Sequence, residues 1–168
     1  MLNNPEARIR DAVYAEKNWH DYEDRTRAVR TERYKYIRND YTDLPLTPPA
    51  DAWRSITADE VRRLRAAGKL TPEQAVIFRT PKPAEELYDL EADPNEFVNL
   101  AGDPKMAETL GRLRQKLAQW EKETDDRKPS ARTPDEFDRG TGKPLENTRR
   151  PRPGKNRALF QGAAPRGD

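Results

Sequence analysis

The densest group of chemically capable side chains is the run WHDYED at residues 19–24. It combines aromatic rings, the chain's single histidine and three carboxylates. A loop of this composition could line the mouth of a carbohydrate pocket, because carboxylates and an imidazole exchange hydrogen bonds with hydroxyl groups. The alternative is a loop that satisfies its own polar groups, with His20 bonded to Asp21 or Glu23 and Trp19 packed on a sheet edge. Trp19, His20 and Asp21 are therefore candidate substrate-binding residues.

Three arginines follow this run, at residues 27, 30 and 33. A planar guanidinium can bind sulfate or carboxylate through two parallel hydrogen bonds. Alternate side chains of a strand point to opposite faces, so Arg27 and Arg30 cannot meet in one pocket, and Arg33 falls in a turn. We expect these arginines mainly on a solvated face or in interdomain ion pairs. Arg27, the nearest to the 19–24 run, is the fourth substrate-binding candidate.

Neighbouring acids are the groups that general acid–base catalysis or a hard cation would use, as in Asp21 with Asp24 or Glu85 with Glu86. With 30 acidic residues among 168, such pairs arise by chance, so we predict no catalytic residue and no metal ligand. The chain has no cysteine, which excludes disulfides, thiolate metal sites and cysteine nucleophiles. A single histidine excludes any site built from several.

Three β-rich stretches would position these residues. Residues 11–19 alternate apolar and polar side chains, and residues 26–38 do so more strongly, with a polar break at 31–33. Two β-rich runs joined by so short a link predict an antiparallel hairpin. Residues 86–90, ELYDL, predict a further strand that ends at the turn 92–95.

The longest predicted helix runs from about Pro104 to Glu123. Asp103 is its expected N-cap, and proline is well tolerated at the first helical position. The apolar residues recur at spacings of four and three and form one stripe: Met106, Leu110, Leu113, Leu117 and Trp120. The simplest architecture is α+β, a small antiparallel sheet of three or four strands packed by this helix.

A Pro-rich insertion without a periodic pattern, LPLTPPADAW at residues 44–53, separates the hairpin from the last strand. Two short helices are predicted after it. In the first, at residues 57–67, Thr57 is the expected N-cap and Glu60 completes a capping box. The second is predicted over residues 71–79, because a Thr-Pro pair is a typical helix start.

Charge and composition divide the chain in two. Residues 127–168 contain 11 Lys and Arg against 5 Asp and Glu, a net of +6, and the whole chain is +2, so residues 1–126 carry −4. The same segment is rich in proline and glycine and has few apolar side chains, so it cannot offset its ordering entropy by burial. We predict a folded domain at residues 8–126 and an extended or disordered tail at 127–168. The alternative is a tail that wraps across a neighbouring domain and is anchored by its spaced apolar residues, Phe137, Leu145 and Phe160.

The basic run RRPRPGK at residues 149–155 could bind a polyanion through counterion release. No aromatic residue within it could stack bases, so nucleic acid is an unlikely partner. No apolar stretch approaches the roughly 20 residues of a membrane span, so no membrane partner is predicted. One interpretation of the chain is therefore a stand-alone binding module whose tail binds a polyanion.

Three stretches, taken in order, carry a family resemblance: RAVRTERYKYIRN, ELYDLEADPNEFVNLA and a terminal helix that ends in LAQWEKETDD. Together they resemble the C-terminal subdomain of sulfatases, most closely the N-sulfoglucosamine sulfohydrolase (heparan sulfamidase) branch. The similarity runs from about Val13 to Asp126. The tail segment TPDEFDRGTGKPLEN also resembles the tails of bacterial members.

The resemblance implies hydrolysis of a sulfate ester or sulfamate on a sugar. Members of the family use a formylglycine made from Cys or Ser in a C/S-x-P-x-R motif, and a Ca²⁺ held by Asp and Asn side chains, both in a large N-terminal α/β domain. The only serines here, Ser55 and Ser130, begin no such motif. We therefore expect a fragment that lacks the catalytic domain, holds no cofactor of its own and is inactive alone.

The implied partner is a sulfatase catalytic domain, in cis or from an adjacent reading frame, and through it a sulfated carbohydrate. The resemblance also implies that the 19–24 region faces the active-site cleft, so the chain would buttress the catalytic domain and shape one wall of that cleft. The N-terminal sequence MLNNPEARIRD has no apolar signal region, so the chain itself predicts no compartment. Members of the family are usually periplasmic, secreted or lysosomal.

Overall fold

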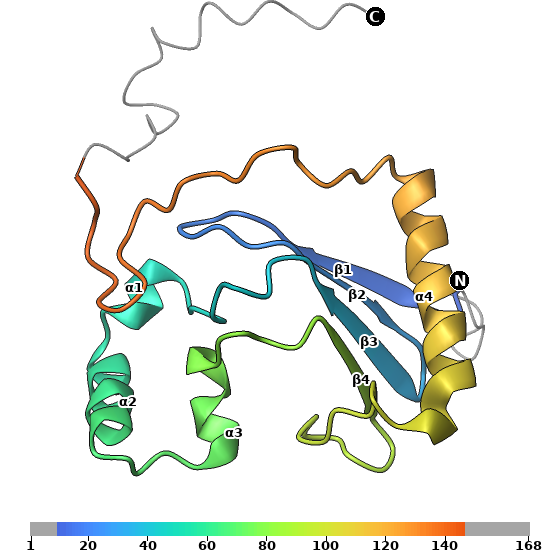
Figure 1. Ribbon diagram of the computed structural model, residues 1–168, viewed down its shortest axis with the longest axis horizontal. Helices are drawn as coiled ribbons and strands as arrows, with labels where there is room; N and C mark the ends of the chain where they lie inside the picture. The colour runs from blue at the N-terminus through green and yellow to red at the C-terminus, as the bar shows by residue number, and fades with distance from the viewer. Residues whose placement is uncertain (1–9, 147–168) are drawn as a thin grey trace, which may run out of the picture.

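A computed structural model describes residues 10–146 and contains one four-stranded antiparallel sheet (Figure 1). Its strands pair in chain order: β1 Val13–Lys17, β2 Thr26–Arg30, β3 Tyr34–Asn39 and β4 Glu85–Asp89. The predicted hairpin is the β2–β3 pair, and the strands predicted before and after it flank this pair. The α+β class is therefore confirmed.

The register of the strands sets the core face of the sheet. One residue from each strand lies in the same row: Tyr14, Val29, Tyr36 and Leu87. Residues in one row share a face, and Val29 and Leu87 are fully buried there. Arg30, the next residue along β2, is exposed, which confirms the alternation that the sequence predicts for this strand.

Helix α4, Ala107–Glu123, packs on this face and follows a single 3-10 turn, η2, at Pro104–Met106. The predicted cap is present, because the side chain of Asp103 accepts a hydrogen bond from the backbone N–H of Lys105. The helix therefore starts where the sequence places it, although its first turn is tighter than an α-turn. None of the described helices is long and apolar enough to cross a membrane.

The apolar stripe of α4 forms the other half of the core. Leu110, Leu113 and Leu117 are buried against the sheet. At the end of the stripe, the Trp120 ring stacks on Tyr14 with 5.3 Å between the ring centroids. Burial of one leucine side chain contributes about 2 kcal/mol, so this stripe is a major source of stability.

The insertion between β3 and β4 forms a group of short helices. These are α1 Ala50–Trp53, α2 Ile56–Ala66, α3 Pro72–Ala75 and the 3-10 turn η1 Val76–Phe78. The helix α1 was not predicted. The N-cap of α2 is Ser55, whose side chain accepts from the N–H of Ala58, so the prediction of Thr57 as the cap is wrong. Glu60 accordingly forms no capping box and instead pairs with Arg63 one turn later.

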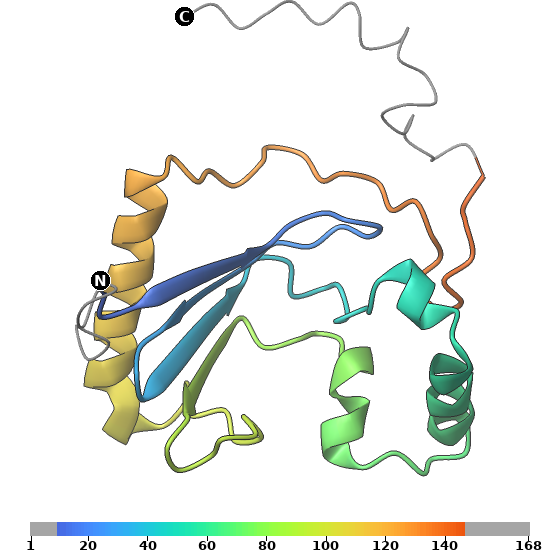
Figure 2. The same ribbon diagram turned by 180° about the vertical axis from the view of Figure 1, so that it is seen from behind.

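Helix α4 covers one face of the sheet, and the insertion helices lie beyond the ends of the strands (Figure 1). Figures 1 and 2 show α4 at one side and α1, α2 and α3 gathered at the other. The segment after α4 crosses back over the molecule as an extended chain and reaches α1. It makes an isolated bridge between Phe137 and Pro144. The division into a domain and a tail at residue 126 remains a prediction, and residues 147–168 lie outside the described part of the chain.

Residues of the motifs behind the family resemblance hold this fold together. The Arg33 guanidinium donates to both carboxylate oxygens of Asp89, at 2.7 to 3.1 Å, and so joins the β2–β3 turn to the end of β4. The Asn99 side chain accepts from the N–H of Leu87 and donates to the carbonyl of Glu85. It thereby covers the outer edge of β4, which would otherwise offer unpaired backbone groups.

Candidate functional site

The predicted site lies in the long connection between β1 and β2. The last residue pair of these strands is Lys17 with Thr26, so residues 18–25 form the loop. Its second half, residues 22–25, is buried. The Asp21 carbonyl accepts from the N–H of Glu136, which fastens the loop to the segment that follows α4. The loop is therefore positioned by contacts from a distant part of the sequence.

Trp19 stands at the rim of a hollow of about 220 Å³. Its indole Nε1 donates to the carbonyl of Pro134 at 3.0 Å. The same hollow is also lined by Arg27, so the structure brings two of the four predicted residues to one place. The indole thus contacts the segment after α4, from which Pro134 comes.

His20 and Asp21 line a separate, smaller hollow of about 40 Å³. The imidazole of His20 is 81% exposed, and its Nδ1 lies 3.3 Å from Asp21 Oδ2. The same oxygen of Asp21 accepts from the N–H of Ala50 at 2.7 Å, at the first residue of α1. Asp21 therefore holds both the histidine and the start of a helix, while the outer part of the imidazole stays accessible.

Arg27 is almost fully buried, with 2% of its side chain exposed. It donates to both carboxylate oxygens of Asp126, from Nε and from Nη2. Its Nη1 donates to the carbonyls of Lys17 and Thr26. Burial is the largest single effect and lowers the pKa of Arg27, but the hydrogen bonds to Asp126 and the charges of Asp126, Glu16 and Asp40 together outweigh it and raise that pKa.

Arg27 belongs to a network of paired charges. Three arginines and four acids form it: Arg25, Arg27 and Arg38 with Glu16, Asp40, Glu121 and Asp126. Hydrogen bonds from Arg27 hold the pKa of Asp126 below its usual range, against the effect of burial. The hydrogen bond to Glu121 raises the pKa of Arg38. The hollow beside Trp19 is lined by three arginines and three acids, so it is close to neutral, and its arginines already have anionic partners within the chain.

A second buried ion cluster lies under the loop. Asp24 Oδ1 accepts from Lys82 Nζ at 2.8 Å, and its Oδ2 lies 2.9 Å from Lys17 Nζ. Burial alone would raise the pKa of the Asp24 carboxyl, but the two lysines lower it. Because Lys82 precedes β4, this cluster fixes the loop to the end of the insertion.

The segment after α4 contributes contacts that the sequence did not predict. Phe137 is buried against Tyr22 and Ala50. The Asp135 carboxylate accepts from the N–H of Glu23 at 2.7 Å. The Arg139 guanidinium donates to the Glu23 carbonyl at 2.6 Å. The sequence signal was the set of spaced apolar residues, of which Phe160 lies outside the described residues. They suggested anchors on a neighbouring domain, whereas Phe137 packs against residues of this same chain.

The paired acids Glu85 and Glu86 already have hydrogen-bond or ion-pair partners within the chain. Glu85 accepts from the Tyr36 hydroxyl and pairs with Arg114. Glu86 accepts from the side chains of Asn39 and Tyr88. Among residues 10–146 no three His, Cys, Asp or Glu side chains lie together in a way that could hold a metal ion. The Ca²⁺ and the formylglycine that the family implies, and their place in another domain, remain predictions.

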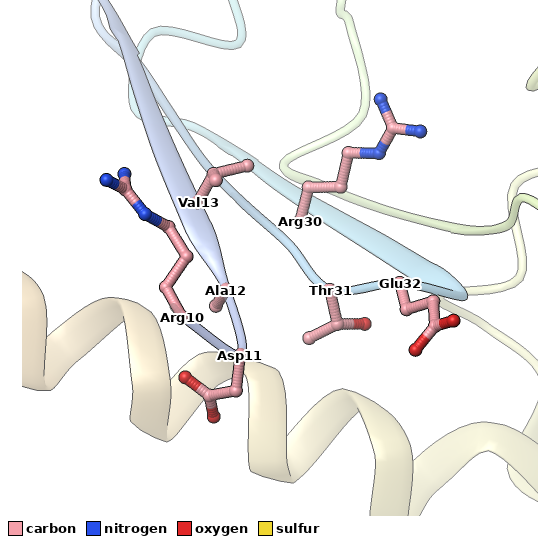
Figure 3. Close-up of a pocket in the computed structure, with 7 residues that line it drawn as sticks. All are labelled: Arg10, Asp11, Ala12, Val13, Arg30, Thr31 and Glu32. Carbon is pink, nitrogen blue, oxygen red and sulfur yellow. The ribbon is translucent and has the colours of Figure 1, made fainter. Parts of the chain in front are cut away.

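A larger hollow of about 460 Å³ lies away from the predicted residues, beside the ends of β1 and β2 (Figure 3). Arg10 and Arg30 point away from each other there, and Asp11 points toward α4. Asp11 is paired with Lys116 of that helix. Because the charged side chains diverge, this hollow does not bring them to one ligand.

The chain forms a small sheet packed by one amphipathic helix, with a polar loop fastened at the end of the sheet, and in sequence it is similar to two sulfatases. No protein-family model matches the chain. It is 42% identical over 113 residues to the ulvan-active sulfatase of Formosa agariphila, a match that covers 66% of this chain and 19% of that protein. It is 33% identical over 101 residues to the N-sulphoglucosamine sulphohydrolase of Homo sapiens, covering 60% of this chain and 20% of that protein.

Solved structures give weaker matches. A 2-O GAG sulfatase superposes with a TM-score of 0.45 and 21% identity, over 74% of this chain and 19% of that one. A protein solved in complex with D-glucosamine-2-N,6-O-disulfate superposes with a TM-score of 0.43 and 22% identity, over 71% of this chain and 17% of that one. The sequence matches carry the relationship: the chain is a homologue of sulfatases and spans about a fifth of the length of the curated relatives it matches.

Proposed function

We propose that the chain is the C-terminal part of a sulfatase that hydrolyses sulfate esters or sulfamates of sugars. In this role it buttresses the catalytic domain and shapes one wall of the substrate cleft. The observation that carries the proposal is the 42% identity over 113 residues to a sulfatase active on ulvan. The catalytic groups would then belong to the remaining four fifths of such an enzyme, and this chain would supply positioning and substrate contacts.

Within this function, the β1–β2 loop contacts the sugar. Trp19 and His20 can reach a ligand as they stand, because one lines a hollow and the other is mostly exposed. Asp21 accepts a hydrogen bond from the N–H of Ala50, and Arg27 donates to Asp126. In this role the two residues hold the loop in place and do not contact the sugar directly. An indole offers a flat apolar face to a sugar ring, and an imidazole offers a hydrogen bond to its hydroxyls or its sulfate.

The test uses a chimera in which the matching segment of the Formosa agariphila sulfatase is replaced by this chain. We expect Trp19→Ala and His20→Ala to raise KM for the polysaccharide while kcat changes little, because both residues act through binding. Trp19→Phe keeps a ring but loses the hydrogen bond to Pro134, so it separates sugar stacking from loop support. Lys122→Ala, at an exposed position of α4, is the matched control.

Unchanged KM in both alanine variants would reject the role of the loop. Equal damage in Trp19→Phe and Trp19→Ala would assign Trp19 to loop support alone, since the phenylalanine ring can still stack on a sugar.

A further inference from the structure

A hollow of about 230 Å³ lies among the helices of the insertion, outside the predicted site. Its walls come from α1, α2 and η1, and from residues 139–140 of the segment that follows α4. Figures 1 and 2 show these helices beyond the ends of the strands, at the end of the molecule away from α4. The hollow is therefore separate from the core and from the Arg27 network.

The lining of this hollow is aromatic and basic. Three arginines face it, Arg62, Arg65 and Arg139, and none of the residues that line it is acidic. Arg62 lies over the ring of Trp53 with 4.9 Å from its Cζ to the ring centroid. Arg65 lies over the ring of Phe78 at 4.2 Å. Stacking holds a guanidinium plane in place and leaves its N–H edge available to an anion.

The three arginines differ in how many of their guanidinium N–H groups already have an acceptor within the chain. Arg62 donates to the Trp53 carbonyl and pairs with Asp59. Arg139 pairs with Asp135. The side chain of Arg65 makes no hydrogen bond or ion pair with any residue of the described part of the chain. Its guanidinium instead lies over the ring of Phe78. Arg65 is thus the group with the most capacity left for an outside anion.

We propose that this hollow binds one anionic sugar unit, through the sulfate or carboxylate that the sugar carries. The inference rests on the proposed function, because it names a second contact for the same class of polymer. The volume is below the roughly 300–1,000 Å³ of sites for drug-sized ligands, which suits a single sugar unit. Thr47 and Arg139 line both this hollow and the one beside His20 and Asp21, so the two adjoin. A polymer can therefore contact both at once.

The test measures binding of the full chain by calorimetry to three polymers: dextran sulfate, polygalacturonate and neutral dextran. The first carries sulfate alone, the second carboxylate alone and the third no charge. We expect Arg65→Gln to weaken binding of an anionic polymer about tenfold, since a charge-assisted hydrogen bond is lost. Arg63→Gln is the matched control, because Arg63 also lies in the last turn of α2, does not line the hollow and pairs with Glu60.

A further variant, Arg149→Gln with Arg150→Gln and Arg152→Gln, measures binding by the basic run of the tail. Loss in Arg65→Gln with little change in Arg63→Gln supports the inference, and the polymer affected identifies sulfate or carboxylate. Equal loss in Arg63→Gln and Arg65→Gln, loss only in the tail variant, or no binding to either anionic polymer overturns it. Sulfate release by the chimera is measured separately. A failure of the binding test therefore rejects this second site without deciding whether the chain is part of a sulfatase.

Discussion

The substitution Asp126→Asn tests the ion network beneath the candidate site. Asp126 accepts hydrogen bonds from Arg27 and Arg25, whose side chains are 2% and 4% exposed. Without the carboxylate, Arg27 keeps Glu16 at 3.7 Å, which is half exposed, and the charge of Asp40, to which it has no ion pair. Arg25 keeps Asp40 at 2.9 Å. The substitution therefore leaves one buried guanidinium largely unpaired.

The expected loss in the free energy of unfolding is about 3 kcal/mol, at the lower end of the roughly 3–5 kcal/mol seen when one partner of a buried pair is removed. The lower end applies because the Asp126 side chain is 15% exposed and Arg25 retains a partner. In a chain of this size the loss corresponds to a fall of about 6–12 °C in Tm. Thermal and urea unfolding, followed by the helical circular dichroism signal, measure this loss of stability.

The pH dependence gives an independent check. The pKa of Asp126 is lower in the folded chain than in the unfolded one, so its contribution is present above about pH 4 and is lost as the pH falls through the folded pKa. The difference in the free energy of unfolding between the wild-type chain and Asp126→Asn should therefore shrink as the pH falls below about 4. The matched control is Asp125→Asn, because Asp125 is 74% exposed and pairs with an exposed Arg127, a contact worth less than about 0.5 kcal/mol. If Asp126→Asn is no more destabilising than Asp125→Asn, the network does not hold the site.

Three further predictions concern the core, the segment after α4 and one surface pair. Leu113→Ala should cost about 3 kcal/mol in urea unfolding, because Leu113 is fully buried, whereas the exposed Val98→Ala should cost under about 0.5 kcal/mol; equal costs would contradict the core assignment. Phe137→Ala should speed amide exchange in residues 130–146 and leave the central strands protected, and unchanged exchange in that segment would show that Phe137 is not its anchor. The Arg132 guanidinium lowers the pKa of Asp43 to about 2, so NMR titration should find that value, and Arg132→Gln should return the pKa toward about 3.9. Because the folded pKa is the lower one, the pair stabilises the fold above about pH 4 and loses this effect toward pH 2. An unshifted Asp43 pKa in the wild-type chain would refute the contact.

The elements with strong periodicity were predictable. The spacing of Leu110, Leu113 and Leu117 places one apolar face on a helix, and alternation along residues 26–38 places Arg27 and Arg30 on opposite faces of a strand. Short helices were less predictable. Ser55 and Thr57 both carry a hydroxyl that can cap a helix, and local sequence does not decide between them. Helix α1 depends on tertiary contacts, because Asp21 holds its first N–H.

The candidate site was predictable in its residue types but not in its partners. Alternation places Arg27 and Arg30 on opposite faces, but the expectation of a solvated face or an interdomain ion pair is wrong for Arg27, which is buried. Its partner Asp126 lies 99 residues away in the same chain and leaves no local signal. The same holds for Trp19, whose partner Pro134 is 115 residues away. Long-range pairs of this kind follow from how the segment after α4 crosses the molecule, which no periodic pattern encodes.

The most direct test of the central claim is sulfate release from ulvan by the chimera described above. The comparison is with the parent Formosa agariphila sulfatase and with a version that lacks the matching segment. If this chain is a sulfatase C-terminal part, the chimera releases sulfate at a rate comparable to the parent, while the version without the segment does not. A chimera that is folded and soluble but releases no more sulfate than the version without the segment would contradict the claim.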